Sequence, residues 1–498
     1  MITIALLFVL TSLSFVLLYW FRSNGSKLEP PLADKKRFLI GHAQYFYGGS
    51  EALWENISIL TEQSRKYDGV LKLIIGLQNS YFVADPDDFA TVMNSCLLKL
   101  KIVDFAKPWL GNGLVTASPS IWKAHRRLIN PSFNQHVVDS FLGIFNSQSR
   151  RFVRSLEVEV GKGPFDHYVY CHRIALETIC QTALGDDFMK NSAKSSEYVC
   201  TIDKMLNILI SRFQKFWLHP DIIYNFSSVK RQEKDCIKIL HKGSTAILQK
   251  KKESYMKEMS SKDENFNIYL TNIGTKFKPF IQLLLELSHN TKVLTEDEIK
   301  EHVDTIIVSG SDTSGGTITY CMLLIGSYPR VQNKIIEELQ TVFGNDDRDV
   351  TKEDLSKLVY LDAVIKESIR LYPTVALTGR DIEEDLKLRN YTLSKGASVY
   401  LSIYALYHHP QWGPDVEEFK PERWLDPSLL PSWANSIGFG VGRRFCIGKT
   451  YALMSIKTTI VHVCRNFLIY GNHKNMKLKL DVLLKPASGH YITIKKRT

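Results

Sequence analysis

A helical segment between Thr295 and Tyr328 restricts the fold of this chain more than any other part of the sequence. The segment begins with a capping box, in which Thr295 and Glu298 satisfy backbone amides that a helix start leaves unpaired. Pro329 marks its end. A helix of this length, roughly 50 Å, is too long for an ordinary surface helix. The sequence therefore predicts a helix-rich domain with this helix buried inside it.

The middle of this segment, residues 308–316, consists mostly of poor helix formers. A buried helix with a weak centre suggests a local distortion that is kept open for function. Asp312 and Thr313 place an acid and a hydroxyl at that point. The alternative is that a turn splits the segment into two helices.

The rest of the sequence favours one large domain that is mainly α with small β-sheets, an α+β fold. Of the 498 residues, 44% are hydrophobic, which permits a large core and excludes disordered, collagen-like and coiled-coil chains. Short β-like segments are found at 70–75, 81–83, 399–403 and 491–494. We expect the domain to span residues 45–498, after a basic, Pro-containing hinge at 22–44.

Residues 1–21 form an uncharged segment that is apolar and long enough to cross a membrane. About 20 helical residues span the roughly 30 Å hydrocarbon layer. The segment lacks the basic start and cleavage site of a signal peptide, and the first basic residues, Arg22 and Lys27, follow it. The positive-inside rule then places the rest of the chain in the cytosol. We expect a retained transmembrane helix; the alternative is a buried core helix.

The net charge of +11 and the cysteine spacing further restrict the class of protein and its binding partners. Eight cysteines without a CxxC pair argue against a zinc ribbon, an iron–sulfur ferredoxin and a disulfide-stapled scaffold. The basic excess suits an anionic membrane or an acidic protein partner. Binding of nucleic acid is not expected, because no binding module accompanies the basic residues.

Cys446 lies in a loop of unusual composition, F-G-V-G-R-R-F-C-I-G at residues 439–448. The glycines allow tight turns that point backbone amides at one sulfur. Those amides, together with Arg443 and Arg444, favour a thiolate, and so does the dipole of the helical run that begins at Lys449. The other seven cysteines are interpreted as small buried hydrophobes. We therefore predict that Cys446 is an anionic, axially coordinating sulfur.

This decapeptide resembles the haem-binding signature F-x-x-G-x-R-x-C-x-G of the cytochrome P450 family at every fixed position. Other motifs of that family recur in order across nearly the whole chain: W-x-x-x-R at Trp122, the oxygen-activation motif at 309–314, E-x-x-R at Glu367, R-x-x-x-x-D at Arg380 and P-E-R at Pro421. The resemblance implies the cytochrome P450 fold, preceded by the N-terminal transmembrane helix. It also implies a haem b cofactor.

The resemblance assigns a role to each matching residue. Cys446 is expected to be the proximal thiolate ligand of the haem iron, with Phe439 at the start of the same signature. Four residues fall at positions that hold the haem propionates, and guanidinium groups suit such carboxylates. These residues are Trp122, Arg126, Arg380 and Arg444.

Two further sets of residues receive roles from the same resemblance. Glu367, Arg370 and Arg423 are expected to form a buried charge network that serves folding and haem retention. Asp312 and Thr313 are expected to deliver protons during oxygen activation. The implied reaction is monooxygenation, in which one oxygen atom enters a C–H bond and the other leaves as water.

Electrons have to come from outside, because we find no flavin- or nicotinamide-binding segment in the sequence. The resemblance implies NADPH as their source, through the membrane-bound NADPH–cytochrome P450 reductase, with a small b-type cytochrome as a further candidate partner. It also implies a single-pass protein of the endoplasmic reticulum membrane with its catalytic domain on the cytosolic side. Five basic residues in the proximal motifs are expected to meet the acidic reductase: Lys123, Arg127, Arg443, Lys449 and Lys457.

Residues 108–114 and 303–305 resemble the clan that contains fatty-acid ω-hydroxylases and many insect enzymes. Ser309 replaces the Glu that some members use to esterify the haem, so we expect non-covalent haem. The expected pocket is mostly apolar, which suits a lipophilic substrate: Phe105, Trp109, Val308, Val375, Ala376, Leu377 and Ser488. A haem-thiolate isomerase or dehydratase and a non-catalytic haem-binding protein stay open as alternatives, although Asp312 and Thr313 argue against the isomerase or dehydratase.

Overall fold

The structure is a computed structural model that describes residues 29–37, 40–76, 78–185, 192–260, 277–291 and 294–497. The expected membrane anchor at 1–21 and much of the expected hinge at 22–44 lie outside the described residues. Within the described part of the chain, no helix combines the length and the apolar character needed to cross a bilayer. The chain forms two compact units, and each is described by itself.

The smaller unit includes the described residues up to Leu100, joined by Leu377–Leu406 and Val441–Arg444. Its centre is a four-stranded sheet in the order β1-β2-β6-β3, in which only the β2–β6 pair is parallel. The strands are β1 (Val70–Ile75), β2 (Gln78–Val83), β3 (Leu377–Asp381) and β6 (Ser398–Ser402). The sheet confirms three of the predicted β-like segments.

Helices cover this sheet, and a small hairpin extends it. Helix α2 packs against β1 and β2, and β1 is buried along almost its whole length. The elements around the sheet are η1 (Ala43–Phe46), α2 (Gly49–Arg65), α3 (Pro86–Ser95), β4 (Leu386–Lys387) and β5 (Thr392–Leu393). Helix α18 (Ile403–Tyr407) follows β6.

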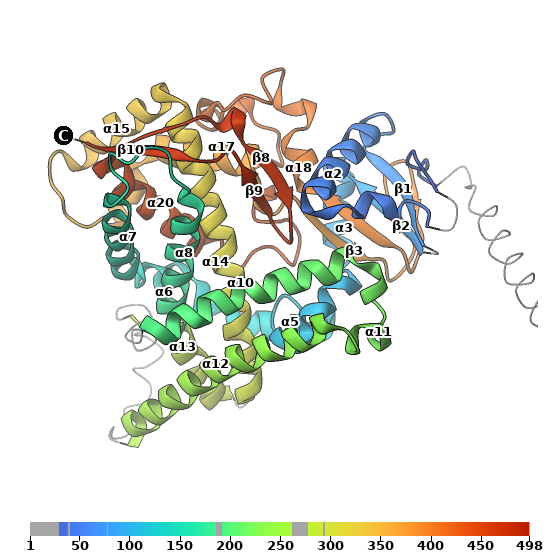
Figure 1. Cartoon of the computed structure of the whole chain (residues 1–498), viewed down its shortest axis with the longest axis horizontal. Helices are drawn as coiled ribbons and strands as arrows, with labels where there is room; N and C mark the ends of the chain where they lie inside the picture. The colour runs from blue at the N-terminus through green and yellow to red at the C-terminus, as the bar shows by residue number, and fades with distance from the viewer. Residues whose placement is uncertain are drawn as a thin grey trace, which may run out of the picture. The chain divides into compact units, whose positions relative to one another are not determined.

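The larger unit contains Lys101–Ala376, Tyr407–Gly440 and Phe445–Thr498 and is mostly helical (Figure 1). Its longer helices are α5 (Pro119–Ile129), α7 (Leu142–Glu157), α8 (His167–Leu184), α10 (Ser192–Gln214), α12 (Ser228–Ser260), α13 (Phe280–Thr291), α14 (Glu296–Ser327), α15 (Pro329–Phe343), α17 (Val359–Leu371) and α20 (Lys449–Asn466). Its short helices are η2 (Lys101–Ala106), α4 (Lys107–Leu110), η3 (Asn130–Phe133), α6 (Gln135–Asp139), η4 (Phe216–Leu218), α11 (Asp221–Asn225), α16 (Lys352–Lys357), η6 (Pro410–Trp412), η7 (Pro421–Trp424), η8 (Pro427–Leu429), α19 (Ala434–Ile437) and η9 (His473–Asn475). Two antiparallel strand pairs complete the unit: β7 (Phe467–Gly471) with β10 (Ile492–Lys496), and β8 (Lys477–Leu480) with β9 (Leu484–Ser488).

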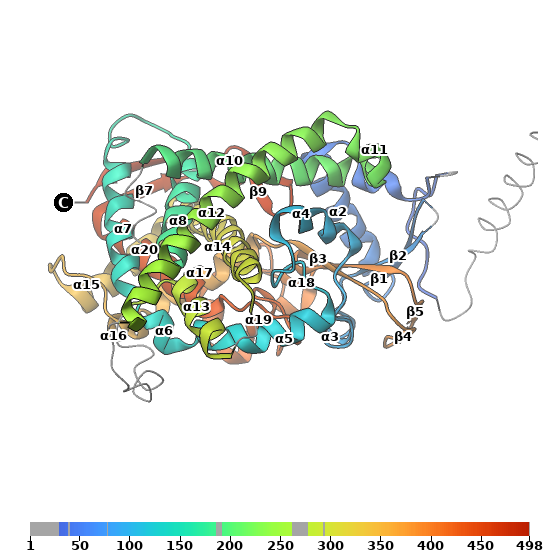
Figure 2. The ribbon, with the colours of Figure 1, turned by 90° about the horizontal axis from the view of Figure 1, so that it is seen from below.

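Helix α14 is the centre of the larger unit, as the sequence predicts. It packs against α8, α17 and α20, and Figures 1 and 2 show it passing between the surrounding helices of this unit. Both hydrogen bonds of the predicted capping box are present at Thr295 and Glu298. The helix continues without interruption through residues 308–316, so the alternative of two separate helices is wrong.

The glycines at the weak centre of α14 reflect close packing against α8. A Cβ atom at Gly315 would lie 2.9 Å from Cα of His172, closer than such atoms can approach. Between His302 and Gly326, every residue of α14 is buried except Val308, Ser309, Gly310 and Thr313. The weak centre therefore combines a tightly packed side with an accessible stripe on the other side.

Candidate active site

The cysteine loop of the larger unit is tied back on itself before α20 begins. The Cys446 amide donates a hydrogen bond of 2.7 Å to the Phe439 carbonyl, and Gly448 is the N-cap of α20. Cys446 is exposed, and so is Cys200, whereas the other six cysteines are buried. The interpretation of Cys200 as a buried hydrophobe is therefore wrong, because it lies on an open face of α10.

The surroundings of Cys446 shift the pKa of its thiol in both directions. Desolvation raises this pKa, although the residue is exposed. The Gly448 amide and the positive charges of Arg126 and Lys449 lower it but do not outweigh desolvation. Coordination to a metal ion deprotonates such a thiol, so this shift of the free thiol leaves the prediction of an anionic, coordinating sulfur in place.

Helix α5 brings Arg126 to the cysteine loop within the larger unit. Arg126 is buried, as is Trp122 on the same helix, and Nη1 of Arg126 donates to the Phe445 carbonyl at 3.0 Å. The guanidinium lies over the Phe445 ring, 4.8 Å from its centroid, and its Nε donates to Asn130. Burial lowers the pKa of Arg126, and the Cys446 sulfur opposes this shift. The arginine is therefore fixed beside the sulfur.

The smaller unit holds the other two predicted propionate residues, Arg380 and Arg444. Arg380 is buried on β3, and burial lowers its pKa to about 10. Burial also lowers the pKa of Arg444 to about 10, and the positive charge of Arg380 adds to the shift. Lys99, which the sequence analysis missed, belongs to the same cluster: burial and these two arginines lower its pKa to about 7. Three cations that repel one another in this way form a site for an anion.

The backbone of α3 in the smaller unit explains why position 442 of the cysteine loop is a glycine. Gly442 has φ +72°, and a Cβ atom there would lie 2.5 Å from the Met93 carbonyl oxygen. Next to it, Nη2 of Arg443 donates to the Asn94 carbonyl at 3.3 Å. Glycine is therefore required at position 442, because the backbone of α3 leaves no space for a side chain.

Glu367, Arg370 and Arg423 lie together in the larger unit, and all three are buried. Nε and Nη2 of Arg370 donate to the two Glu367 carboxylate oxygens at 2.9 and 3.0 Å. Nε of Arg423 donates to the same carboxylate at 2.9 Å, and Trp424 adds a bond of 2.8 Å from its indole. The remaining Arg370 donors reach backbone carbonyls, so the charges in this network are compensated.

Asp312 and Thr313 project from α14 in different directions. The Asp312 carboxylate is buried and lies 3.0 Å from Nδ1 of His172 and 2.9 Å from Nζ of Lys485. Burial raises the pKa of Asp312, but these two cationic partners outweigh burial and hold the pKa below its usual value. Thr313 lies on the accessible stripe, where its Oγ1 donates to the Ser309 carbonyl at 2.6 Å. Sequence reasoning identified the pair but missed His172 and Lys485, which no motif marks.

The residues expected to line the pocket and those expected to meet the reductase differ in how deeply they are buried. Trp109 and Ala376 are fully buried in the core, whereas Ser488 is exposed and Phe105, Val308, Val375 and Leu377 are half-buried.

Lys457 is buried in α20, and its ammonium donates to the Leu355 carbonyl at 2.9 Å. Its assignment to a docking surface is therefore wrong. Lys123, Arg127 and Arg443 are exposed, and Lys449 is half-buried.

Comparison with known proteins places the chain in a family. Residues 32–494 match the cytochrome P450 family. The chain is 32% identical to cytochrome P450 4V2 of Mus musculus over 92% of its length and 88% of that protein. It is 30% identical to cytochrome P450 4c21 of Blattella germanica over 89% of each chain, and 29% identical to cytochrome P450 4c3 of Drosophila melanogaster over 86% of this chain and 82% of that protein.

The chain belongs to the cytochrome P450 family, and it is related to the branch that contains fatty-acid hydroxylases and insect enzymes. It is therefore a monooxygenase with a haem iron cofactor and a cysteine thiolate ligand. The described residues fit this group. In the smaller unit, the cations Lys99, Arg380 and Arg444 suit a carboxylate. In the larger unit, the exposed residue Cys446 has two positive charges near its sulfur, those of Arg126 and Lys449.

Proposed function

We propose that this protein is a membrane-anchored monooxygenase that hydroxylates lipophilic molecules, with fatty acids as the first class to test. The observation that supports this most strongly is the Cys446 loop, where a complete family signature places an exposed cysteine between α5 and the start of α20. When bound, haem supplies oxygen activation and transfer of one oxygen atom. The protein supplies binding, orientation and protons.

In this proposal each site residue has a defined task. Cys446 ligates the iron, with Phe439 accepting the hydrogen bond that shapes the loop. Trp122, Arg126, Arg380 and Arg444 hold the propionates. Glu367, Arg370 and Arg423 support folding and haem retention, and Asp312 and Thr313 manage the protons. Because Ser309 occupies the position of the esterifying Glu, the haem is bound non-covalently.

The proposal also includes the membrane and the electron donor. Residues 1–21 anchor the catalytic domain, residues 45–498, to the cytosolic side of the endoplasmic reticulum membrane. Electrons come from NADPH through NADPH–cytochrome P450 reductase, with a small b-type cytochrome as a second donor. The exposed basic residues Lys123 and Arg127 on α5 support an acidic partner.

Full-length protein in microsomal membranes tests this function. We expect the reduced protein with carbon monoxide to show the red-shifted absorption band of a thiolate-ligated haem. With reductase and NADPH, it should convert dodecanoate to a hydroxylated product. Cys446→Ser should abolish the thiolate band, while Cys464→Ser, at a buried cysteine outside the signature, should retain it.

Three results would contradict the proposal in different ways. Haem-loaded protein without the thiolate band would exclude every haem-thiolate activity. A normal band with rapid, reductase-independent conversion of a lipid hydroperoxide would instead favour the isomerase or dehydratase. A normal band without turnover of fatty acids, volatile lipids or xenobiotics would favour a non-catalytic haem protein.

A further inference from the structure

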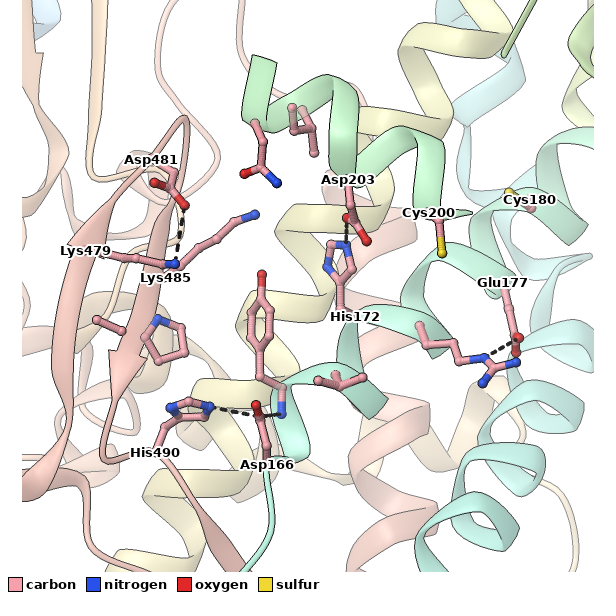
Figure 3. Close-up of a pocket in the computed structure, with 17 residues that line it drawn as sticks. Asp166, His172, Glu177, Cys180, Cys200, Asp203, Lys479, Asp481, Lys485 and His490 are labelled. Atoms are coloured by element: carbon pink, nitrogen blue, oxygen red, sulfur yellow. Dashed lines mark hydrogen bonds and ion pairs between the residues drawn. The ribbon is translucent and has the colours of Figure 1, made fainter. Parts of the chain in front are cut away.

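A cavity of about 530 Å³ lies beside α14 but contains none of the predicted site residues. Its walls come from α8, α10 and the β8–β9 hairpin, as Figure 3 shows. The lining is rich in charged side chains of both signs, among them Asp166, Asp203, Lys479, Asp481 and His490. Charged side chains of this kind hold water through hydrogen bonds, so the cavity is suited to contain it.

Two residues of the wall, His172 and Lys485, contact the buried Asp312 of α14, and His172 also contacts a carboxylate on the cavity side. His172 of α8 contacts the cavity-side Asp203 through Nε2, at 3.0 Å (Figure 3). Its other ring nitrogen, Nδ1, lies 3.0 Å from Oδ1 of Asp312 on α14. The Asp203 side chain is 45% exposed and that of Asp312 only 5%, so the imidazole bridges an open carboxylate and a buried one.

The contact between His172 and Asp312 has the length of a hydrogen bond between charged groups. Nδ1 of His172 and Oδ1 of Asp312 are both buried and lie 3.0 Å apart. The hydrogen bond to Asp312 and the charge of this carboxylate both raise the pKa of His172. The two atoms are therefore close enough for a proton to pass directly between them.

We propose that His172 carries protons from this cavity to Asp312, which makes the cavity the proton entrance for oxygen activation. The proposal rests on the proposed monooxygenase function. In the transfer, the Nδ1–H bond of the imidazolium breaks and an O–H bond forms on Oδ1 of Asp312. The neutral ring keeps its Nε2–H bond, so its vacant nitrogen is Nδ1. The ring turns until Nδ1 faces the cavity, takes a proton there from cavity water, and turns back, while bulk water restores the proton to the cavity.

The charges around His172 support a protonated resting state. Burial lowers the pKa of His172, but the carboxylates of Asp203 and Asp312 outweigh burial and raise it to about 9. The Tyr168 ring stacks on the imidazole at 5.7 Å, and burial raises the pKa of this phenol, so it stays neutral. From β9, Lys485 contacts Asp312 and leaves that carboxylate ionised. At neutral pH the bridge thus holds its proton on the imidazole, and the proton moves through Asp312 only when oxygen activation consumes it.

A pair of histidine substitutions separates proton transfer from structural support. His172→Gln retains a hydrogen-bonding side chain that does not titrate. His490→Gln is the matched control, since His490 lines the same cavity and binds Asp166 at 2.9 Å but has no contact with Asp312 in the described structure. Both full-length, haem-loaded variants are assayed with reductase, NADPH and dodecanoate, in water and in deuterium oxide.

We expect His172→Gln to lower product formed per NADPH roughly tenfold and to increase the solvent isotope effect. This loss is smaller than the 10²–10⁴-fold typical of a positioned acid, because water still enters the cavity. His490→Gln should behave as the wild type. Equal product yields and isotope effects for His172→Gln and His490→Gln, with an active wild type, would overturn the relay alone.

A second measurement does not depend on turnover. The imidazolium of His172 stabilises the folded state fully below its ordinary pKa of 6.5, and this contribution is lost as pH rises through about 9. The melting temperature of the wild type should therefore fall between pH 7 and 10 more steeply than that of His172→Gln. If the melting temperatures of the wild type and His172→Gln fall equally steeply with pH, then His172 does not form a charged bridge between Asp203 and Asp312. A wild type with the expected slope but no product would overturn the monooxygenase function, and the relay with it.

Discussion

Asp312 and Thr313 are adjacent in the sequence, but their side chains lie in different surroundings. Successive residues of an α-helix point about 100° apart, so a neighbouring acid and hydroxyl do not share a face. Asp312 is held by His172 and Lys485 on the packed side of α14, while Thr313 lies on the accessible stripe. If both act on one proton, the carboxylate has to move or water has to connect them.

Thr313→Ala should therefore uncouple NADPH oxidation from product formation. Removal of the hydroxyl should leave haem binding and helix packing intact, because the Thr313 hydroxyl donates to the Ser309 carbonyl of its own helix. We expect product per NADPH to fall about tenfold or more, with hydrogen peroxide released instead. Stopped assays of NADPH, peroxide and product measure this ratio.

Thr319→Ala is the matched control for that substitution. Thr319 lies on the same helix and makes the same type of bond, from Oγ1 to the Gly315 carbonyl at 2.9 Å, but it is fully buried. This variant should lose some stability and retain its coupling ratio. Unchanged coupling in Thr313→Ala would remove the hydroxyl from the proton path.

At the scale of elements, sequence and structure agree best where local rules decide the outcome. The capping box and Pro329 were sufficient to predict the limits of α14, because both act within one turn of the chain. The packing of α8 against Gly315 was not predictable, since it depends on two helices more than a hundred residues apart in sequence. The same reason explains why His172, Lys485 and Lys99 were missed.

The network around Glu367 joins α17 to η7 and provides a test of stability at this scale. Glu367→Gln keeps the shape of the side chain but removes the carboxylate that Arg370 and Arg423 share, and Arg423 then retains Asp415 at 3.3 Å. We expect a loss of about 3–5 kcal/mol in unfolding free energy, because buried charges become uncompensated. Urea unfolding of the haem-loaded protein, followed by circular dichroism, measures the change.

Lys366→Gln is the control on the same helix. Lys366 pairs with Asp362 at 2.9 Å, but both side chains are about one-third exposed. An exposed pair contributes about 0–1 kcal/mol, so this variant should unfold close to the wild type. If Glu367→Gln is no less stable than Lys366→Gln, the network does not hold the fold together.

At the scale of the whole molecule, the net charge of +11 has several origins. The sequence identified Lys123, Arg127, Arg443, Lys449 and Lys457 together, because motif position carries no information on burial. The structure excludes Lys457 from the expected docking surface, because its buried ammonium donates to the Leu355 carbonyl and lies near Asp362. Arg380, Arg444 and Lys99 form a separate cationic cluster suited to an anion.

The exposed residues of α5 predict how the electron donor docks. In the double variant Lys123→Glu and Arg127→Glu, we expect reductase-dependent reduction of the haem to slow roughly tenfold at low ionic strength, because steering by opposite charge is lost. The difference should shrink as salt rises, since screening shortens from about 10 Å at 0.1 M to about 3 Å at 1 M. Stopped-flow spectroscopy measures the rate. The double variant Lys234→Glu and Lys238→Glu, at exposed lysines of α12 outside the motifs, makes the same change in net charge, and chemical reduction by dithionite controls for damage to the haem site. Equal slowing by this control variant would show that only net charge matters and that α5 is not the docking surface.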